Sequence, residues 1–428
     1  MAATNEIYQA AWDLITADAV ASTLMEMVDI SSPTGREIDM ARYLVDRMQR
    51  AGLDAELQFV SAGRPNAVGH LRGDGGGRNL LFTGHMDTSY DGTEDHLSGE
   101  GFKPQAINRD GWIWGLGARN MKSGLAAALV ALEALAKAGP RLQGDISFGG
   151  VVGEIEKTPV EEFVGDEYSG YGIGSKHMVT HGITADYAIL MEPTQNRIST
   201  ANMGCMWMRI DVAGTVNHSA YSSRPGVVNA ITVMNELYPD LRAWAEEYEA
   251  THVFMNEHPN ITFGAVRGGL PWRLSRNPFS CSLYLEARLV PGQSMEEVKR
   301  SLRRVLRAFA RRTGAVEPVL SVYVSDPAVC VDEDAGIVEA LRRGQAAVLG
   351  AGKPSIMRRP GADAVHFTVY GVPCVSFGPG GRSHPDLADQ PAHVVGEHVP
   401  VDDLVAAARI YLATAVDICG AAAPSRPA

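Results

Sequence analysis

Residues 79–90, NLLFTGHMDTSY, decide the fold that the sequence predicts. The first six residues form a short apolar run that is typical of a buried strand, and His85 and Asp87 follow where such a strand would end. The same arrangement recurs along the chain, because a strand-length apolar run precedes polar or glycine-rich residues in DISFGGVVGEIE (145–156), YAILME (187–192) and VSFGPGG (375–381). Helical patterns lie between these runs, which predicts an α/β domain with a mostly parallel sheet covered on both faces.

The middle of the chain departs from this alternation. Strand patterns at 205–214, 261–266, 281–290 and 320–324, with helical patterns near 226–249 and from Met295 to about Arg311, give the order β-α-β-β-α-β. That order predicts an α+β, ferredoxin-like domain with an open sheet and two helices on one face. We therefore expect a catalytic domain in two halves, 1–202 and 326–428, with a lid domain inserted at 203–325.

Composition narrows the class of partner. The chain has 428 residues and a net charge of -12, which argues against binding to nucleic acid or to an anionic membrane. A small carboxylate substrate stays compatible, since a local cationic pocket can lie inside an acidic protein. Five scattered cysteines without a C-x-x-C pair, and an N-terminus without a signal-peptide pattern, predict reduced thiols in a cytoplasmic protein.

Polar residues follow each strand of the predicted parallel sheet. The carboxyl ends of parallel strands share one edge of a sheet, and α/β proteins bind ligands there. Imidazoles and carboxylates that converge at that edge favour a site for Zn²⁺ or a similar cation. The candidates are His85, Asp87, Glu154, Glu156, Glu192, His384 and His393.

Several motifs together resemble one family of metallopeptidases and deacylases, which includes acetylornithine deacetylase, succinyl-diaminopimelate desuccinylase, aminoacylase and carboxypeptidase G. GHMDTSY resembles the family's G-H-x-D-x-V motif, GLGARNMKSG resembles G-R-G-x-x-D-M-K-G, and LMEPT resembles a strand that ends in Glu-Pro-Thr. The resemblance spans almost the whole chain and extends to NHSAYSSRPGVVNAI (217–231) and AHVVGEHVPVDDL (392–404). It implies a phosphorylase/hydrolase-like catalytic domain with a ferredoxin-like lid.

The resemblance also implies roles for single residues. His85 and Glu192 would hold the first metal ion, Asp87 would orient His85, and Glu154 would be the general base that deprotonates the attacking water. His393 would belong to a second metal site. His218 of the lid would polarise the scissile group across a dimer interface, which implies a homodimer or a higher homo-oligomer.

Substrate contacts are less sharply indicated. Arg288, in LEARLVPG, and the glycine loop with Gly378 and Gly380 would hold a substrate carboxylate. Asn277 and its aromatic and cationic neighbours, in GGLPWRLSRNPF, are further candidates. The alternatives are structural: Arg288 can pair with Glu286, Asp87 can cap a turn, and His218 can organise its loop. His384 fits a loop residue better than a ligand, because His393 matches the motif.

Asn120 is the first departure from the family pattern, which has a metal-bridging aspartate at this position. Two divalent ions in a co-catalytic site lie roughly 3.5–4 Å apart. Their repulsion is on the order of 20 kcal/mol at an effective dielectric of about 20. An anionic bridge offsets much of this repulsion and a neutral amide offsets little. The sequence therefore favours one divalent transition metal ion (Zn, Mn or Co) per subunit over two.

A broken Glu-Glu pair and an insertion are the other departures. In VVGEIEK, Ile155 occupies the position of the family's second-metal ligand and cannot bind a cation. Glu156 could supply that ligand only if the alignment shifts by one residue. The acidic, turn-rich stretch 156–170 follows the base and would either reshape the pocket or form a surface loop.

The pattern predicts an enzyme that hydrolyses a C–N bond in a small carboxylate-bearing compound. The altered site favours an aromatic amine, as in the family's divergent 5-nitroanthranilate aminohydrolase branch, with release of ammonia. The alternatives are a two-metal deacylase or peptidase for N-acyl amino acids, and a non-catalytic carboxylate-binding protein.

Overall fold

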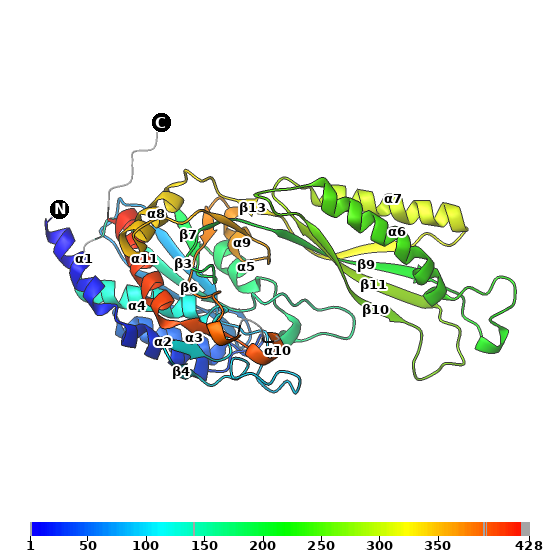
Figure 1. The fold of residues 1–428 in the computed structure, drawn as a ribbon, viewed down its shortest axis with the longest axis horizontal. Helices are drawn as coiled ribbons and strands as arrows, with labels where there is room; N and C mark the ends of the chain where they lie inside the picture. Colours follow the sequence, from blue (N-terminus) through cyan, green and yellow to red (C-terminus); the bar gives the residue numbers. More distant parts are fainter. Residues whose placement is uncertain (1, 140–141, 388–389, 391, 421–428) are drawn as a thin grey trace. The chain divides into compact units, whose positions relative to one another are not determined.

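The computed structural model describes residues 2–139, 142–387, 390 and 392–420 (Figure 1). The chain divides into two compact units. The larger comprises Met1–Thr200, Val331–Ile356 and Ala362–Ala428, and the smaller comprises Ala201–Cys330 and Met357–Gly361. The division into a catalytic domain and a lid domain at 202/203 and 325/326 remains a prediction from the sequence.

A nine-stranded sheet forms the framework among the described residues, in the order β1-β2-β6-β3-β7-β15-β8-β13, with β14 also paired to β8. Its centre is parallel, because β3 pairs in parallel with β6 and β7, and β7 pairs in parallel with β15. The strands are β1 (Asp54–Ser61), β2 (Arg64–Leu71), β3 (Leu80–His85), β6 (Ile146–Val151), β7 (Tyr187–Leu190), β8 (Ser199–Asn202), β13 (Val329–Cys330), β14 (Ile356–Arg358) and β15 (Cys374–Ser376).

Helices cover both faces of the parallel centre. Leu80 and Phe82 of β3 belong to one hydrophobic core, whereas Leu81, which points to the opposite face, belongs to another. The first core also takes in residues of α1 (Ala2–Leu14), α2 (Ala17–Asp29), α3 (Ile38–Arg50), α4 (Lys122–Ala138), α8 (Gly336–Leu349) and α11 (Val401–Cys419). The second takes in residues of α5 (Ile173–Thr180) and α9 (Ala364–Thr368).

Helix α4 packs into the first core, and all of its Leu side chains and most of its Ala side chains are buried. Gly124 in its first turn faces the end of β7, where an added Cβ would lie 1.9 Å from the carbonyl oxygen of Met191. Only glycine permits this approach. The close packing brings the start of α4 beside the segment that carries Glu192.

A small three-stranded sheet, ordered β16-β5-β4, completes the larger unit. Its strands are β4 (Ile107–Arg109), β5 (Trp112–Trp114) and β16 (His398–Pro400), and the short helix α10 (Ala392–Val395) precedes β16.

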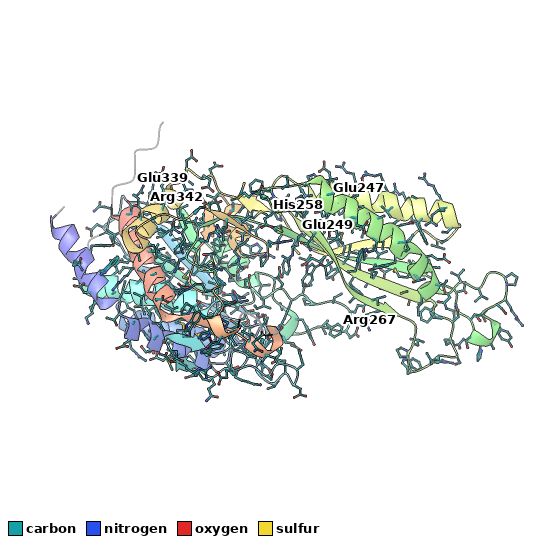
Figure 2. The ribbon with its side chains drawn as sticks, in the orientation of Figure 1. Glu247, Glu249, His258, Arg267, Glu339 and Arg342 are labelled. Carbon is teal, nitrogen blue, oxygen red and sulfur yellow. The ribbon has the colours of Figure 1, made fainter. Side chains whose placement is uncertain are left out.

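The smaller unit is an antiparallel sheet ordered β10-β11-β9-β12. Figure 1 shows its two helices together on one face of the sheet. The elements follow in the chain as β9 (Gly204–Ala213), α6 (Ala230–Thr251), β10 (Asn260–Gly268), β11 (Ser280–Leu289), α7 (Met295–Thr313) and β12 (Val319–Asp326). Glu249, labelled on α6 in Figure 2, ties the helix to the start of β10, because its carboxylate accepts a 2.8 Å hydrogen bond from the amide of Ile261.

The predicted fold class is confirmed: the sheet with the parallel centre is covered on both faces, and the inserted segment has the β-α-β-β-α-β order. In the part of the chain that the structure describes, none of the helices combines the length and apolarity needed to cross a bilayer.

Candidate metal and catalytic site

Three buried side chains converge at the carboxyl edge of the parallel sheet. His85 is the last residue of β3, Glu154 follows β6, and Glu192 follows β7. Nε2 of His85 lies 3.5 Å from Oε2 of Glu154 and 3.7 Å from Oε1 of Glu192. One potential ligand atom from each residue lies within 4.8 Å of the others. The predicted convergence at this edge therefore holds for these three residues.

Asp87 forms hydrogen bonds that connect the segments carrying His85 and Glu154. Its carboxylate accepts hydrogen bonds from the amides of Glu154 (3.0 Å) and Ile155 (3.2 Å) and from the hydroxyl of Thr34 (2.9 Å). Its backbone carbonyl lies 2.8 Å from Nδ1 of His85. One residue thus orients both the imidazole and the turn that carries Glu154.

The cluster is acidic and buried. Burial raises the pKa of Glu154 well above its usual range, and the carboxylates of Glu192 and Asp363 raise it further. A divalent cation offsets this mutual repulsion and favours the ionised carboxylates. Carboxylate oxygens and an imidazole nitrogen are also the donor set that Zn²⁺ and Mn²⁺ accept.

Two potential metal-ligand atoms without hydrogen-bond partners in the described part of the chain also indicate that the site suits a cation. Nε2 of His85 and Oδ1 of Asn120 are buried and have no hydrogen-bond partner among the described residues. A buried polar atom without a partner is costly, so atoms of this kind indicate a missing ligand. The residues present therefore fit a bound cation.

The turn before α4 places Asn120 beside the end of β3. The sulfur of the next residue, Met121, lies 3.2 Å from the amide nitrogen of His85, which donates to it. The carboxylate of Glu397 accepts hydrogen bonds from the amides of Asn120 (2.8 Å) and Arg119 (3.1 Å). Glu397, which we did not single out from the sequence, thus anchors the turn through its backbone.

Ligands for a second ion are less evident. Ile155 is buried, and Glu156 does not join the donor group around His85 in the described part of the chain. His393 lies in α10, but its side chain falls outside what the structure describes. His384 lies in a loop, where its amide donates to Nε2 of His398 at 3.0 Å.

The acidic stretch 156–170 leaves and rejoins the turn of Glu154 at nearly the same point. The amides of Lys157 and Tyr171 both donate to the carbonyl of Ile155, at 2.6 and 3.1 Å, and the amide of Gly170 donates to that of Lys157 at 3.1 Å. A compact loop with adjoining ends is an Ω-loop. Its central residues, including Phe163 and Val164, are exposed.

The glycine loop after β15 packs on the segment that follows Glu192. The amide of Gly378 donates to the hydroxyl of Thr194 at 3.0 Å, and the carbonyl of Gly380 accepts from the amide of Gln195 at 2.8 Å. These contacts place Gly378 and Gly380 near Glu192 along the sheet edge.

The remaining candidates lie in the smaller unit. His218 begins a short 3₁₀ turn, where its Nδ1 accepts from the amide of Ala220 at 3.1 Å. The amide group of Asn277 donates to the carbonyls of Thr215 (2.8 Å) and Val228 (2.7 Å), so Asn277 braces the loop that carries His218. Arg288 forms a 2.8 Å ion pair with Glu286, the partner that its structural alternative names.

A second buried cluster went unnoticed in the sequence. The carboxylate of Asp363 accepts a 2.5 Å hydrogen bond from the hydroxyl of Ser175 and lies 3.6 Å from Nε2 of His366. Burial raises the pKa of Asp363 to about 7 and lowers that of His366 to about 3. The only signal was GADAVHF (361–367), a charged residue and a histidine in an otherwise apolar stretch that follows no predicted strand.

Comparison with known proteins gives matches over most of the chain. The profile of peptidase family M20/M25/M40 matches residues 81–417. An acetylornithine deacetylase of Myxococcus xanthus is 28% identical over 95% of this chain and 99% of its own. An N-formyl-4-amino-5-aminomethyl-2-methylpyrimidine deformylase of Halalkalibacterium halodurans is 24% identical over 94% of both chains.

The fold is shared with solved structures. That of aminopeptidase PepT from Bacillus cereus superposes with a TM-score of 0.73 at 20% identity, over 95% of this chain and 99% of the other. That of human carnosine dipeptidase 1 gives a TM-score of 0.70 at 16% identity, over 97% and 98%.

Proposed function

Since the chain belongs to peptidase family M20/M25/M40, a family of metal-dependent hydrolases, we propose that it cleaves the amide C–N bond of a small N-acyl compound, with Glu154 as the general base. The observation that carries this proposal is the buried group of His85, Glu154 and Glu192 at the edge of the sheet.

His85 and Glu192 would hold the cation, with Asn120 lending one carbonyl oxygen. When bound, a divalent cation supplies a Lewis acid that acidifies water and polarises a carbonyl oxygen. Glu154 takes the proton from the attacking water and delivers it to the leaving nitrogen. Burial and the carboxylates of Glu192 and Asp363 raise the pKa of Glu154, which makes its carboxylate a stronger base. Asp87 would hold Glu154 and the imidazole of His85 in their relative orientation.

We propose one tightly held ion per subunit. The neutral amide of Asn120 offsets little repulsion between two ions, and Ile155 offers no ligand atom. The metal would be Zn, Mn or Co, and the family's two-ion arrangement is the alternative, with Glu156 and His393 as its ligands.

The substrate is proposed to carry a carboxylate. Gly378 and Gly380 lie near Glu192, and the backbone amide of Gly380 would donate to the substrate carboxylate. The amide of Gly378 already donates to Thr194 and Arg288 is paired with Glu286, so both are weaker candidates. His218 and Asn277 of the inserted domain would reach the substrate across a homodimer interface. We therefore still propose a homodimer or a higher homo-oligomer. All five cysteines are free thiols, which supports a reducing, cytoplasmic location.

The two curated relatives named above are a deacetylase and a deformylase, so we place an N-acyl amide ahead of the aromatic amine that the altered site first favoured. Hydrolysis of an aromatic amine is the second candidate, because Asn120 and Ile155 both weaken a two-ion site. Non-catalytic carboxylate binding is the third. The geometry of a base beside ligands speaks against it.

Ammonia and free-amine release should be measured over N-acetyl and N-formyl amino acids, dipeptides and aminobenzoates, with Zn²⁺, Mn²⁺ or Co²⁺ supplied. Cleavage of an N-acyl substrate supports the proposal, ammonia release from an aminobenzoate supports the second candidate, and inactivity throughout with no bound metal supports the third.

A further inference from the structure

A fully buried ion pair, Arg64 with Glu37, lies near the turn of Glu154 and includes none of the proposed metal or substrate residues. Arg64, the first residue of β2, is 1% exposed, and Glu37, at the start of α3, is 0% exposed. Nε and Nη2 of Arg64 donate to the two carboxylate oxygens of Glu37 at 3.0 and 2.5 Å. The pair is therefore bidentate, which fixes the plane of the guanidinium.

The third nitrogen of Arg64 binds the returning limb of the Ω-loop. Nη1 donates to the carbonyl of Ser169 at 2.6 Å and to that of Asp166 at 3.3 Å. The carbonyl of Asp166 also accepts from the amide of Ser169 at 3.1 Å, at the end of a short 3₁₀ turn. Arg64 thus ties this turn of the insertion to the protein core.

The same guanidinium packs over the residue that precedes the base. A Cβ added at Gly153 would lie 2.8 Å from Nη2 of Arg64 and 3.0 Å from the carbonyl oxygen of Ser169. Gly153 has a φ of +63°, which glycine adopts without strain. The turn of Glu154 therefore packs directly against Arg64 of β2 and against the Ω-loop at Ser169.

Glu37 links this arrangement to the other side of the base. Its carboxylate accepts from the amide of Gly35 at 3.0 Å, and the neighbouring hydroxyl of Thr34 donates to Asp87. A Cβ at Gly35 would also meet the backbone of Asp166 at 2.8 Å. Two turns that flank Glu154, at 34–37 and 166–169, are thus joined through one guanidinium.

We propose that Arg64 is a positioning residue for the general base: by joining Glu37 to the returning limb of the Ω-loop, it holds the turn of Glu154 in its catalytic orientation. The proposal rests on the proposed hydrolase function. Lysine cannot replace the contact fully, because a single ammonium lacks the planar fork that reaches a carboxylate and two carbonyls together.

The test separates positioning from stability. Arg64→Met alone leaves the carboxylate of Glu37 buried without its partner, so this variant should be unstable whether or not Arg64 positions the base. In the double variant Arg64→Met/Glu37→Met both charges are gone, so its Tm should return close to that of the wild type. The carbonyls of Asp166 and Ser169 lose their hydrogen bonds from the guanidinium in that variant, so its kcat should remain at least tenfold low at a KM within about twofold of wild type.

A matched control is available in the same unit. Arg47 of α3 makes a bidentate pair with Glu133 of α4, at 2.9 and 2.8 Å. It also donates to Thr23, Glu26 and Tyr43, and none of these residues belongs to the site. Arg47→Met/Glu133→Met should leave kcat, KM and the loop unchanged. Arg64→Lys should recover part of the lost kcat.

Limited proteolysis provides a readout that needs no turnover. A glutamyl endopeptidase, with the cut sites identified by mass spectrometry, should cleave after Glu161 or Glu162 at least tenfold faster in Arg64→Met/Glu37→Met than in the wild type. A wild-type kcat in this variant overturns the proposal, whatever its cleavage rate. If the wild type itself hydrolyses no amide, the proposed function fails, and an unchanged cleavage rate then overturns the anchoring by Arg64 separately.

Discussion

Nδ1 of His85 lies 2.8 Å from the backbone carbonyl oxygen of Asp87. A carbonyl can only accept a hydrogen bond, so this contact requires the proton on Nδ1 and leaves a lone pair on Nε2. Nε2 is the atom that faces Glu154 and Glu192. The backbone of Asp87 therefore sets the tautomer that a metal ligand needs.

Removal of the metal should abolish activity and lower stability. The lone pair of His85 and the carboxylate of Glu192 lose their partner when a chelator strips the cation, and ligand binding to the native state no longer contributes. We expect Tm to fall by roughly 5 °C and to recover with Zn²⁺, Mn²⁺ or Co²⁺. Calorimetry with elemental analysis checks this, and an unchanged Tm at a confirmed loss of metal would contradict it.

Glu154→Gln should lower kcat by about 10²–10⁴-fold, because the amide cannot accept the proton of the attacking water. The amide is isosteric, so metal content should stay near that of the wild type. Glu162→Gln, at an exposed carboxylate of the Ω-loop, is the control and should change kcat by less than about threefold. Equal losses in the two variants would show that Glu154 has no special role.

Asn120→Asp should raise the metal stoichiometry, because a carboxylate can bridge two cations where the amide cannot. Ile155→Glu should add a ligand, so the double variant should approach two ions per subunit. Metal-to-protein ratios from elemental analysis check this. If only Ile155→Glu raises the ratio, the missing ligand rather than the missing bridge limits the site.

Asp363→Asn should stabilise the metal-free protein at alkaline pH. Burial raises the pKa of Asp363 to about 7, above its unfolded value near 4. The native state then binds more protons than the unfolded state between about pH 4 and 7, so the free energy of unfolding falls as the pH rises through this window. The variant lacks this loss. Urea unfolding should show an advantage on the order of 4 kcal/mol at pH 8 that disappears near pH 4.

Much of the site was predictable because strand ends are local features. An apolar run followed by His85, Glu154 or Glu192 marks both the strand and the polar residue at its carboxyl end. The parallel sheet then brings such ends together whatever the sequence between them. The departures at Asn120 and Ile155 were visible for the same reason, since each is a substitution within a recognisable motif.

Residues that act through long-range contacts were not predictable in this way. Arg64 begins β2 and Glu37 directly precedes α3. Charged side chains at such positions are mostly exposed, yet both of these are fully buried. Asp363 follows no strand of the parallel centre. Their partners lie far along the chain, 102 and 105 residues from Arg64 and 188 from Asp363, so no local pattern pairs them.

The sequence by itself determined the two kinds of sheet, the order of their elements and the polar residues at the strand ends, because hydrophobic periodicity reports which face of each element is buried. Only the tertiary structure decided the contacts around Glu154: the tautomer of His85, the hydrogen bonds from backbone amides to Asp87, and those from Arg64 to the Ω-loop. Those contacts depend on distances between segments that are far apart in the chain, and periodicity carries no information about such distances.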